Sequence, residues 1–498
     1  MAGDWRDDRI AELESDLAKR DGIIAAQSTQ IAGLLQRVAV LEEQLRKSSQ
    51  NSSKPPSSDG PAVPARPKKP ASGRKRGGQR GHKRNQRDLV PVESVREIVE
   101  CIPERCRHCD ERLHGSDPEP IRHQVTHLPP IVPITDEYRQ HRLSCDQCDR
   151  TTVGELPAGV PTGAFGPSVV AVVAVMMGAY RQSKRLVPDL LFDLFGLRMS
   201  VGAAVGCQHI ASSALEAPVM EARKYVTERP VKHADETGWR EGATRARAWL
   251  WVVVTASVAV FMVHLRRNAD AAKQLLVAAS GVLVTDRHGA YNWWPDRMRQ
   301  FCWAHLSRDF QTISERSGDS KRIGGALLEE THRLFHFWHR ARDGTLKRAT
   351  LRVYMRALRA RVKVLLTEGA VDPHPEESRT DEKCSGCEAC KTSKTCKKLL
   401  SQFESLWTFV RVEGVEPTNN AGEQILRHGV IMRKLTHGTH SERGSRFVER
   451  ILTVHGTLRL QKRNVLDFVR QACEAALHGA APPSLLPVAA PPAVDIAT

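Results

Sequence analysis

Apolar residues near the N-terminus recur at heptad spacing, and they predict a long helix with one apolar stripe. The positions are Ile10, Leu13, Leu17, Ile24, Ile31, Leu34, Val38, Leu41 and Leu45, with interruptions at Arg20 and Gln27. A stripe of this kind has no core of its own and needs a partner helix. We therefore predict a coiled coil over residues 5–50 that makes the chain a homo-oligomer. The alternative is an amphipathic helix packed on the protein's own body.

A helical pattern fills residues 161–225. Residues 186–195 form one apolar helix that ends at Gly196, and Ser200 is placed to cap the next helix. A helix, a short glycine turn and a second helix outline a helix-turn-helix-like region, although an ordinary helical hairpin has the same pattern. This region is a candidate for DNA binding.

From residue 231 the pattern changes to strands. Residues 231–239, 247–255 and 258–265 read as strands, residues 269–279 as a helix, and residues 282–285 as a short buried strand. This order predicts an α/β fold with an RNase H-like core, whose first part covers residues 226–303. The apolar run 248–265 is interrupted by Thr255, Ser257 and His264, so two strands fit it better than a membrane span, and no membrane partner is expected.

The rest of the chain is predominantly helical. We expect a helical segment over residues 304–410, the last part of the core over residues 411–478 and a disordered tail rich in Pro and Ala over residues 479–498. The first residues lack the basic and apolar regions of a secretion signal, so a cytoplasmic protein is expected, associated with the nucleoid when bound to DNA.

Charge suggests the partner. The 498 residues include 74 Lys and Arg against 57 Asp and Glu, which gives a net charge of +17. This excess favours a polyanion such as nucleic acid and excludes an acidic disordered protein. An apolar fraction of 41% and a charged fraction of 26% are those of an ordinary globular protein.

Much of the positive charge lies in a flexible linker over residues 51–90. Between residues 61 and 88 there are ten basic residues and one acid. A thin, glycine-rich basic segment can follow a DNA groove, whereas many charged linkers are merely solvated. The residues proposed to contact DNA are Arg74, Lys75, Arg76, Arg80, Lys83 and Arg84 here, with Arg433 and Lys434 in a second basic stretch near the C-terminus.

Eight of the twelve cysteines form two clusters. Cys106, Cys109, Cys145 and Cys148 form two Cys-x-x-Cys pairs, the spacing of a closed structural zinc site, and define a zinc-binding domain over residues 91–160. The second cluster is Cys384, Cys387, Cys390 and Cys396. The lysines that flank it favour a zinc knuckle lying on DNA, whereas the ferredoxin-like spacing of its first three cysteines leaves an iron–sulfur cluster as the alternative.

Three acids are candidates for catalysis. Asp235 and Asp286 lie where predicted strands end, and Glu423 lies in the first turn of a predicted helix. Carboxylates from separate elements can bind two Mg²⁺ ions, or Mn²⁺, for phosphoryl transfer. Taken singly, each of these acids is as readily a solvated or salt-bridged carboxylate.

These residues lie in segments that resemble a known family. The heptad stripe, NSSKPPSSD, the Cys-x-x-Cys pairs, HADETGW, TDRHGAY, CWAHLSRDF and EPTNNAGEQILRHGVIMRK, in that order, resemble the DDE transposases of insertion sequence 66 over about residues 10–470. The resemblance implies that Asp235, Asp286 and Glu423 form the metal-binding triad of an RNase H-like core with a helical insertion. It also implies cleavage at transposon ends in double-stranded DNA, joining to target DNA and possible small accessory proteins. Arg287 and Gln424 depart from the family pattern.

Two further residues are secondary candidates. Arg427 lies four residues after Glu423, where it can hold a DNA phosphate or pair with Glu423 itself. His305, in the CWAH segment, can lie near the scissile phosphate or serve as a core or capping residue. Two alternative functions remain open: a catalytically inactive, transposase-derived DNA-binding protein, and an RNase H-fold nuclease that cuts without joining.

Overall fold

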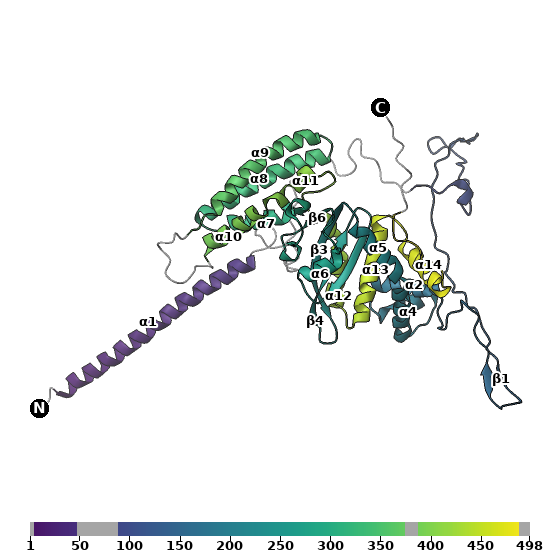
Figure 1. Cartoon of the computed structure of the whole chain (residues 1–498), viewed down its shortest axis with the longest axis horizontal. Helices are drawn as coiled ribbons and strands as arrows, with labels where there is room; N and C mark the ends of the chain where they lie inside the picture. Colours follow the sequence, from purple (N-terminus) through teal and green to yellow (C-terminus); the bar gives the residue numbers. More distant parts are fainter. Residues whose placement is uncertain (1–3, 47–87, 374–386, 488–498) are drawn as a thin grey trace.

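The computed structural model of the chain describes residues 4–46, 88–373 and 387–487 (Figure 1). Its centre is a mixed five-stranded sheet with the order β5-β4-β3-β6-β7. The strands are β3 (Val231–Glu241), β4 (Ala246–Val254), β5 (Ala259–His264), β6 (Val282–Thr285) and β7 (Arg299–Phe301). The first three strands are antiparallel neighbours, whereas β6 pairs parallel with β3 and β7 pairs parallel with β6. The predicted α/β class and the positions of four of these strands are confirmed.

Helices lie on both sides of this sheet (Figure 1). On the β5 side are α2 (Pro167–Gly178), α3 (Leu186–Phe195), α4 (Val201–Ala214), α5 (Glu216–Thr227), α13 (Glu442–Leu460) and α14 (Val465–Leu477). Against the sheet lie α6 (Ala269–Leu276) and α12 (Asn420–Thr436). Beyond β7 are α7 (Trp303–Ser314), α8 (Gly318–Arg342), α9 (Arg348–Gly369), α10 (Glu388–Ser401) and α11 (Thr408–Arg411).

The short strand β6 separates two hydrophobic cores. Leu283 packs in the core shared with β3–β5 and the helices on the β5 side, whereas Val282 and Val284 pack in the core of the helices α7–α11. Alternate side chains of a strand point to opposite faces, so one apolar strand can serve both cores. This double burial explains why residues 282–285 are apolar throughout.

Helix α13 covers the free edge of the sheet. The backbone N–H groups of Ala259, Phe261 and Val263 on β5 donate to side chains of α13 at 3.1, 2.9 and 2.6 Å. The acceptors, spaced four residues apart, are Thr457, Thr453 and Glu449. Four helical residues rise about 6 Å and two strand residues about 6.6 Å, so the two spacings match. An edge covered in this way cannot pair with another strand.

The predicted helix-turn-helix outline is present. Gly196 ends α3 with φ 65°, and the Ser200 hydroxyl accepts the N–H of Ala203 at 3.1 Å to cap α4. However, α4 packs against α2 and α14 and carries neither Lys nor Arg. Its exposed face, which includes Val201 and Ile210, offers apolar rather than cationic contacts.

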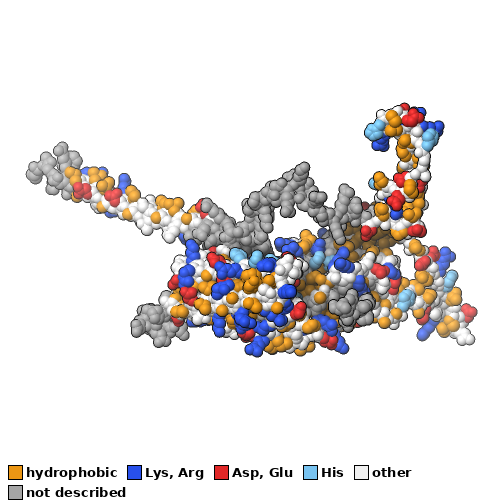
Figure 2. Space-filling model, turned by 90° about the horizontal axis from the view of Figure 1, so that it is seen from above, with side chains coloured by type: hydrophobic (Ala, Val, Ile, Leu, Met, Phe, Trp, Pro, Cys, Tyr) orange, Lys and Arg blue, Asp and Glu red, His pale blue; other side chains and the backbone are white. Residues whose placement is uncertain are grey.

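The N-terminal helix α1 (Asp4–Arg46) extends away from the rest of the chain (Figure 1). The side chains of its apolar stripe are about half exposed wherever they are described, and Figure 2 shows them on the helix surface. The alternative in which this helix packs on the protein's own body is therefore not what the structure shows. Residues 51–87 of the basic linker lie outside the described residues.

The C-terminal tail differs from the prediction over its first part. Leu485 is fully buried, and Ser484 donates to Glu221 of α5 at 2.8 Å. Gln461 and Arg463 donate to backbone carbonyls of residues 484–486. A single buried leucine and these bonds hold residues 480–487 against the helices, which the Pro- and Ala-rich composition did not indicate. Residues 488–498 lie outside the described part.

Candidate active site

Register places the two aspartates side by side. Strands β3 and β6 pair in parallel with Val231 opposite Val282 and His233 opposite Val284. Extending this register by two residues puts Asp235 level with Asp286, which follows the last residue of β6. Neighbouring strands lie about 4.8 Å apart, and residues at one level of a parallel pair point to the same face. Both carboxylates therefore lie on one face of the sheet.

The loop that carries Asp286 is held by a buried arginine. Arg299 is fully buried and donates to the carbonyls of Asp286 and His288 at 3.1 and 3.2 Å. It also donates to Thr285 Oγ1 and Asn292 Oδ1. The N–H of His288 in turn donates to the Asp286 carboxylate at 2.8 Å. These bonds fix the direction of the Asp286 side chain without a counter-charge directly on it.

Helix α12 brings Glu423 to the aspartates through Asn419. Asn419 is fully buried, donates Nδ2–H to the Ala234 carbonyl at 2.8 Å and lies 3.1 Å from His233 Nδ1. Its backbone N–H donates to Cys302 Sγ at 3.2 Å. Asn419 occupies the N-cap position, but its side chain does not cap the helix. It instead fastens the first turn of α12 to β3, one residue before Asp235.

Electrostatics indicate that the three acids converge. Burial raises the pKa of Asp235 well above its ordinary value, and the charges of Glu236, Asp286 and Glu423 raise it further. Burial also raises the pKa of Glu423; Asp286 adds to this effect, whereas Arg308 and Arg427 oppose it. Since such repulsion falls off with distance, each of the three carboxylates lies within reach of another.

A fourth carboxylate, Glu236, lies buried next to the site. Its side chain is 1% exposed, pairs with Arg267 at 2.8 Å and accepts a hydrogen bond from the Tyr291 hydroxyl. Burial and the charge of Asp286 raise its pKa, whereas its bonds to Tyr291 and Arg267 lower it. Since Glu236 is already bound by Arg267 and Tyr291, it flanks the site and is not one of the three candidate acids. Glu236 directly follows Asp235 on β3, so the two side chains leave opposite faces of the strand.

His305 lies at the edge of the same site. His305 Nδ1 is 3.5 Å from Glu423 Oε1, and neither of these buried atoms has a hydrogen-bond partner. Burial, with the charge of Arg308, lowers the pKa of His305 to about 4, so the imidazole is neutral at physiological pH. Cys302, His305 and Glu423 each offer a ligand atom, all within 4.8 Å of one another, the one such group of three found in the described ranges.

The two departures from the family pattern have different surroundings. Arg287 pairs with Asp309 of α7 at 2.6 Å, so it ties the Asp286 loop to that helix. Gln424 is exposed. Arg427 is also exposed and forms no ion pair with Glu423 within 4.0 Å, so the intrahelical pair is not present in this structure.

The first cysteine cluster forms two separate knuckles. In each, the fourth residue after the first cysteine donates its N–H to that cysteine's carbonyl and has a positive φ: Asp110 at 58° and Asp149 at 54°. Backbone N–H groups lower the pKa of both Cys106 and Cys145. The four sulfur atoms do not form one group in the described residues. A shared zinc site therefore remains a prediction.

The second cluster is divided between a helix end and a core. Cys387 is the N-cap residue of α10 and accepts the N–H of Cys390 at 3.3 Å. Cys396 is fully buried in the core of α7–α11, and burial raises the pKa of its thiol to about 11. A metal-binding role for Cys396 therefore remains a prediction. Cys384 lies outside the described residues.

The proposed DNA-contacting residues have different outcomes. Arg74, Lys75, Arg76, Arg80, Lys83 and Arg84 lie outside the described part of the chain. Lys434 is exposed, whereas Arg433 donates to Thr237 Oγ1 and the Gly238 carbonyl at 2.9 and 2.8 Å. Figure 2 shows further Lys and Arg side chains over the face that α8 and α9 present at the top of Figure 1; Arg352, Arg356 and Lys363 of α9 are exposed.

Comparison with known proteins agrees with the resemblance of the sequence to transposases. Residues 162–446 match the family described as Transposase IS66 family, and the chain belongs to this family. Residues 5–88 match a family of unknown function. An uncharacterized protein of Sinorhizobium fredii, y4hP, is 24% identical over 407 residues, which cover 74% of this chain and 70% of that protein. Among the described residues, no helix is long and apolar enough to cross a bilayer.

Proposed function

We propose that this transposase cleaves transposon ends and joins them to target DNA through Asp235, Asp286 and Glu423 in an RNase H-like core. The observation that carries the proposal is the convergence of the three acids from β3, the end of β6 and the first turn of α12. The sheet order, with three antiparallel strands followed by two parallel strands, supports the assignment of the core. The segment between β7 and α12 is then the helical insertion, built around its own hydrophobic core.

The surroundings of the acids fit divalent cations. Asp235 and Glu423 have raised pKa values and no lysine or arginine paired with them within 4.0 Å in the described residues. Glu423 Oε1 is buried without a hydrogen-bond partner. Oxygen ligands of this kind suit Mg²⁺ or Mn²⁺. Two such ions would supply charge stabilisation for the attacking and leaving oxygens of an in-line displacement.

The chain's own residues supply position and proton acceptors. Arg299 and Asn419 hold the loop of Asp286 and the first turn of α12, so the carboxylates keep their relative position before DNA binds. Neutral His305 faces Glu423 with its buried Nδ1, so this nitrogen can accept a proton from the Glu423 carboxyl group. Arg427 is free to contact a phosphate beside the acids.

The test uses purified protein, a labelled transposon-end duplex and Mg²⁺. Asp235→Asn should abolish nicking and joining while DNA binding persists. The matched control is Asp319→Asn, because Asp319 is an exposed aspartate of α8 far from the acids in sequence. Binding without cleavage by the unsubstituted protein would favour the inactive DNA-binding protein, and cleavage without a joined product would favour the nuclease.

We also propose that α1 mediates homo-oligomerisation. Its apolar stripe is exposed along the described helix, and a second copy would bury it in a parallel coiled coil. Leu17→Asp with Leu34→Asp should shift the protein to a smaller species in sedimentation velocity, whereas Lys19→Asp, on the polar face, should not. Equal masses for all three proteins would refute this proposal. Accessory proteins of the same element remain possible partners.

Structural zinc is proposed for the first cysteine cluster. The two knuckles share one backbone conformation, and the lowered pKa of Cys106 and Cys145 favours the thiolates that zinc requires. Elemental analysis should find zinc in the unsubstituted protein, and Cys106→Ser should remove it. The control is Cys473→Ser, a change at a buried thiol outside the clusters, which should leave the zinc in place. Zinc beyond one ion per chain would indicate that Cys384, Cys387 and Cys390 bind another, whereas iron would indicate an iron–sulfur cluster.

A further inference from the structure

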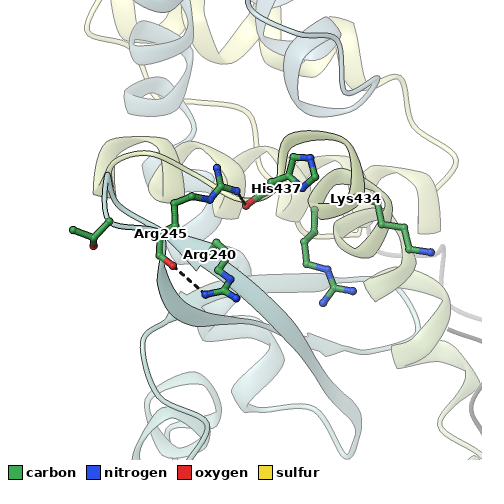
Figure 3. Close-up of a pocket in the computed structure, with 6 residues that line it drawn as sticks. Arg240, Arg245, Lys434 and His437 are labelled. Atoms are coloured by element: carbon green, nitrogen blue, oxygen red, sulfur yellow. Dashed lines mark hydrogen bonds between the residues drawn. The ribbon is translucent and has the colours of Figure 1, made fainter. Parts of the chain in front are cut away.

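A basic hollow lies where the β3–β4 hairpin meets the C-terminal end of α12. It has a volume of about 640 Å³ and is lined by Arg240, Thr244, Arg245, Arg433, Lys434 and His437 (Figure 3). No lining residue is acidic. Four permanent cations in one concave surface create a field that attracts a polyanion.

The cations of the hollow are not neutralised by carboxylates. None of the four forms an ion pair within 4.0 Å anywhere in the described ranges, unlike many arginines of this chain. Arg240 donates to the Arg245 carbonyl at 3.2 Å, and Arg245 donates to the His437 carbonyl at 2.6 Å. A carbonyl acceptor orients a guanidinium but leaves its charge in place, so the side chains are held and remain positive.

The backbone around the hollow is built to keep it open. His437 ends α12 in the left-handed region with φ 57°, and Gly438 follows with φ 106°. A Cβ on Gly438 would lie 2.2 Å from the Arg240 carbonyl oxygen, so only glycine allows this approach of the loop to the hairpin. The N–H of Thr439 then donates to the same carbonyl at 2.9 Å. The loop thereby fixes the C-terminal end of α12, with Lys434, beside Arg240.

Both elements of the hollow also carry an acid of the candidate active site. Arg240 lies five residues after Asp235 on β3, about 16 Å along the strand. Arg433 lies ten residues after Glu423 on α12, about 15 Å along the helix. Two rigid elements thus give the same separation between the acids and the cations. That separation equals about five base pairs of duplex DNA at 3.4 Å per pair.

We propose that this hollow binds backbone phosphates of the DNA substrate about five base pairs from the bond that is cleaved. The inference rests on the proposed function, because it takes the acids as the site of cleavage. The cations hold the flank of the duplex while the scissile phosphate lies at the acids. An alternative role, in which these cations only stabilise the C-terminal end of α12, predicts an effect on stability and none on DNA binding.

The salt dependence of DNA binding tests the proposal. The probe is a fluorescein-labelled duplex of arbitrary sequence, titrated at several salt concentrations with Arg240→Gln/Lys434→Gln and the unsubstituted protein. The logarithm of the binding constant falls against the logarithm of salt with a slope of about −0.9 per phosphate contact, so loss of two contacts should reduce the slope by about 1.8. This difference in slope means that the two substitutions weaken binding roughly 60-fold more at 0.1 M salt than at 1 M salt, because the contacts that they remove are already screened at high salt.

A matched control removes the same charge elsewhere. Lys224 of α5 and Lys462 after α13 are exposed and form no ion pair in the described residues, so Lys224→Gln/Lys462→Gln should keep the original slope. Lys434→Gln alone covers the case in which the double variant fails to fold, because the Lys434 side chain is exposed and forms no hydrogen bond with any residue that the structure describes. This single variant should reduce the slope by about 0.9. Equal slopes for the hollow and control variants would overturn the proposal.

The outcomes also separate this inference from the proposed function. If the hollow variants keep the original slope while Asp235→Asn loses cleavage, the hollow proposal fails and the catalytic one stands. If the hollow variants show a smaller salt dependence of DNA binding and Asp235→Asn still cleaves, the hollow binds DNA but the assigned acids are wrong. If the unsubstituted protein binds neither this duplex nor the transposon-end duplex, both proposals fail.

Discussion

Asn419 is the residue whose replacement tests the construction of the active site most directly. Asn419→Ala removes the donor to the Ala234 carbonyl and the polar contact with His233, both of which are buried. A buried group that loses its partner costs about 1–3 kcal/mol, so the two together should lower the free energy of unfolding by about 2–6 kcal/mol. The first turn of α12 would also lose its attachment to β3, and Glu423 its fixed position. We therefore expect DNA nicking to fall as well.

The neighbouring residue provides the control. Asn420 has the same side chain, begins the same helix and is exposed, so Asn420→Ala should change the free energy of unfolding by less than about 0.5 kcal/mol. Urea unfolding followed by tryptophan fluorescence, with nicking measured on the same preparations, compares the two variants. Equal stability of both would show that the bonds of Asn419 contribute nothing. Lower stability with full nicking would show that Asn419 does not position Glu423.

Gly422 gives an independent route to the same bonds. A Cβ at this position would lie 2.9 Å from Asn419 Oδ1 and 3.1 Å from Asn419 Nδ2. Helix propensity alone predicts that Gly422→Ala stabilises α12 by about 1 kcal/mol. Because the Asn419 side chain is held by its partners, we expect a net loss of both stability and nicking instead. A more stable and fully active variant would contradict this account of the contact.

Two further predictions concern the fold around the site. Gly438→Ala should destabilise the protein by several kcal/mol, because its Cβ would collide with the Arg240 carbonyl, whereas Gly414→Ala, at φ 78° with open space around it, should cost only about 1 kcal/mol in urea unfolding. Burial raises the pKa of Glu449 from 4.5 to about 7, so the folded state binds this proton more tightly than the unfolded chain does. The contribution of Glu449 to stability is therefore greatest in acid and falls as pH rises from about 4.5 to 7. Glu449→Gln should flatten the pH dependence of unfolding over that range, and an unchanged slope would refute the assignment.

The sequence predicted those features that are encoded locally. Alternating and continuous apolar runs located β3, β4, β5 and β6 to within a few residues. The stop at Gly196 and the cap at Ser200 were found because each depends on one residue and its immediate neighbours. Asp286, which directly follows β6, was visible for the same reason, whereas Asp235, expected at a strand end, lies in the middle of β3. Their meeting in space followed from the family resemblance rather than from periodicity.

The features that the sequence did not reveal depend on partners far away in the chain. Asn419 bonds to residues 185 and 186 positions earlier, and nothing in the EPTNN segment distinguishes this role from helix capping. Arg299 looks like one more surface arginine, yet it is fully buried and holds the loop of Asp286. Thr453 and Thr457 interrupt an apolar helix because their hydroxyl oxygens accept hydrogen bonds from backbone N–H groups at the edge of β5. In each case the residue type is explained only by a backbone group on another element.

The same contacts explain how the protein tolerates an unfavourable cluster of acids. Burial and mutual repulsion raise the pKa of Asp235 and Glu423, so ionising them in the folded state costs free energy that the unfolded chain does not bear. This cost grows as pH rises above the ordinary carboxyl range. The bonds of Arg299 hold the loop of Asp286, and those of Asn419 join the first turn of α12, which carries Glu423, to β3 beside Asp235, so the repulsion cannot be relieved by moving the acids apart. A cation that binds only this arrangement must therefore stabilise the fold. Added Mg²⁺ should raise the unfolding temperature of the protein at neutral pH, and it should raise that of Asp235→Asn much less.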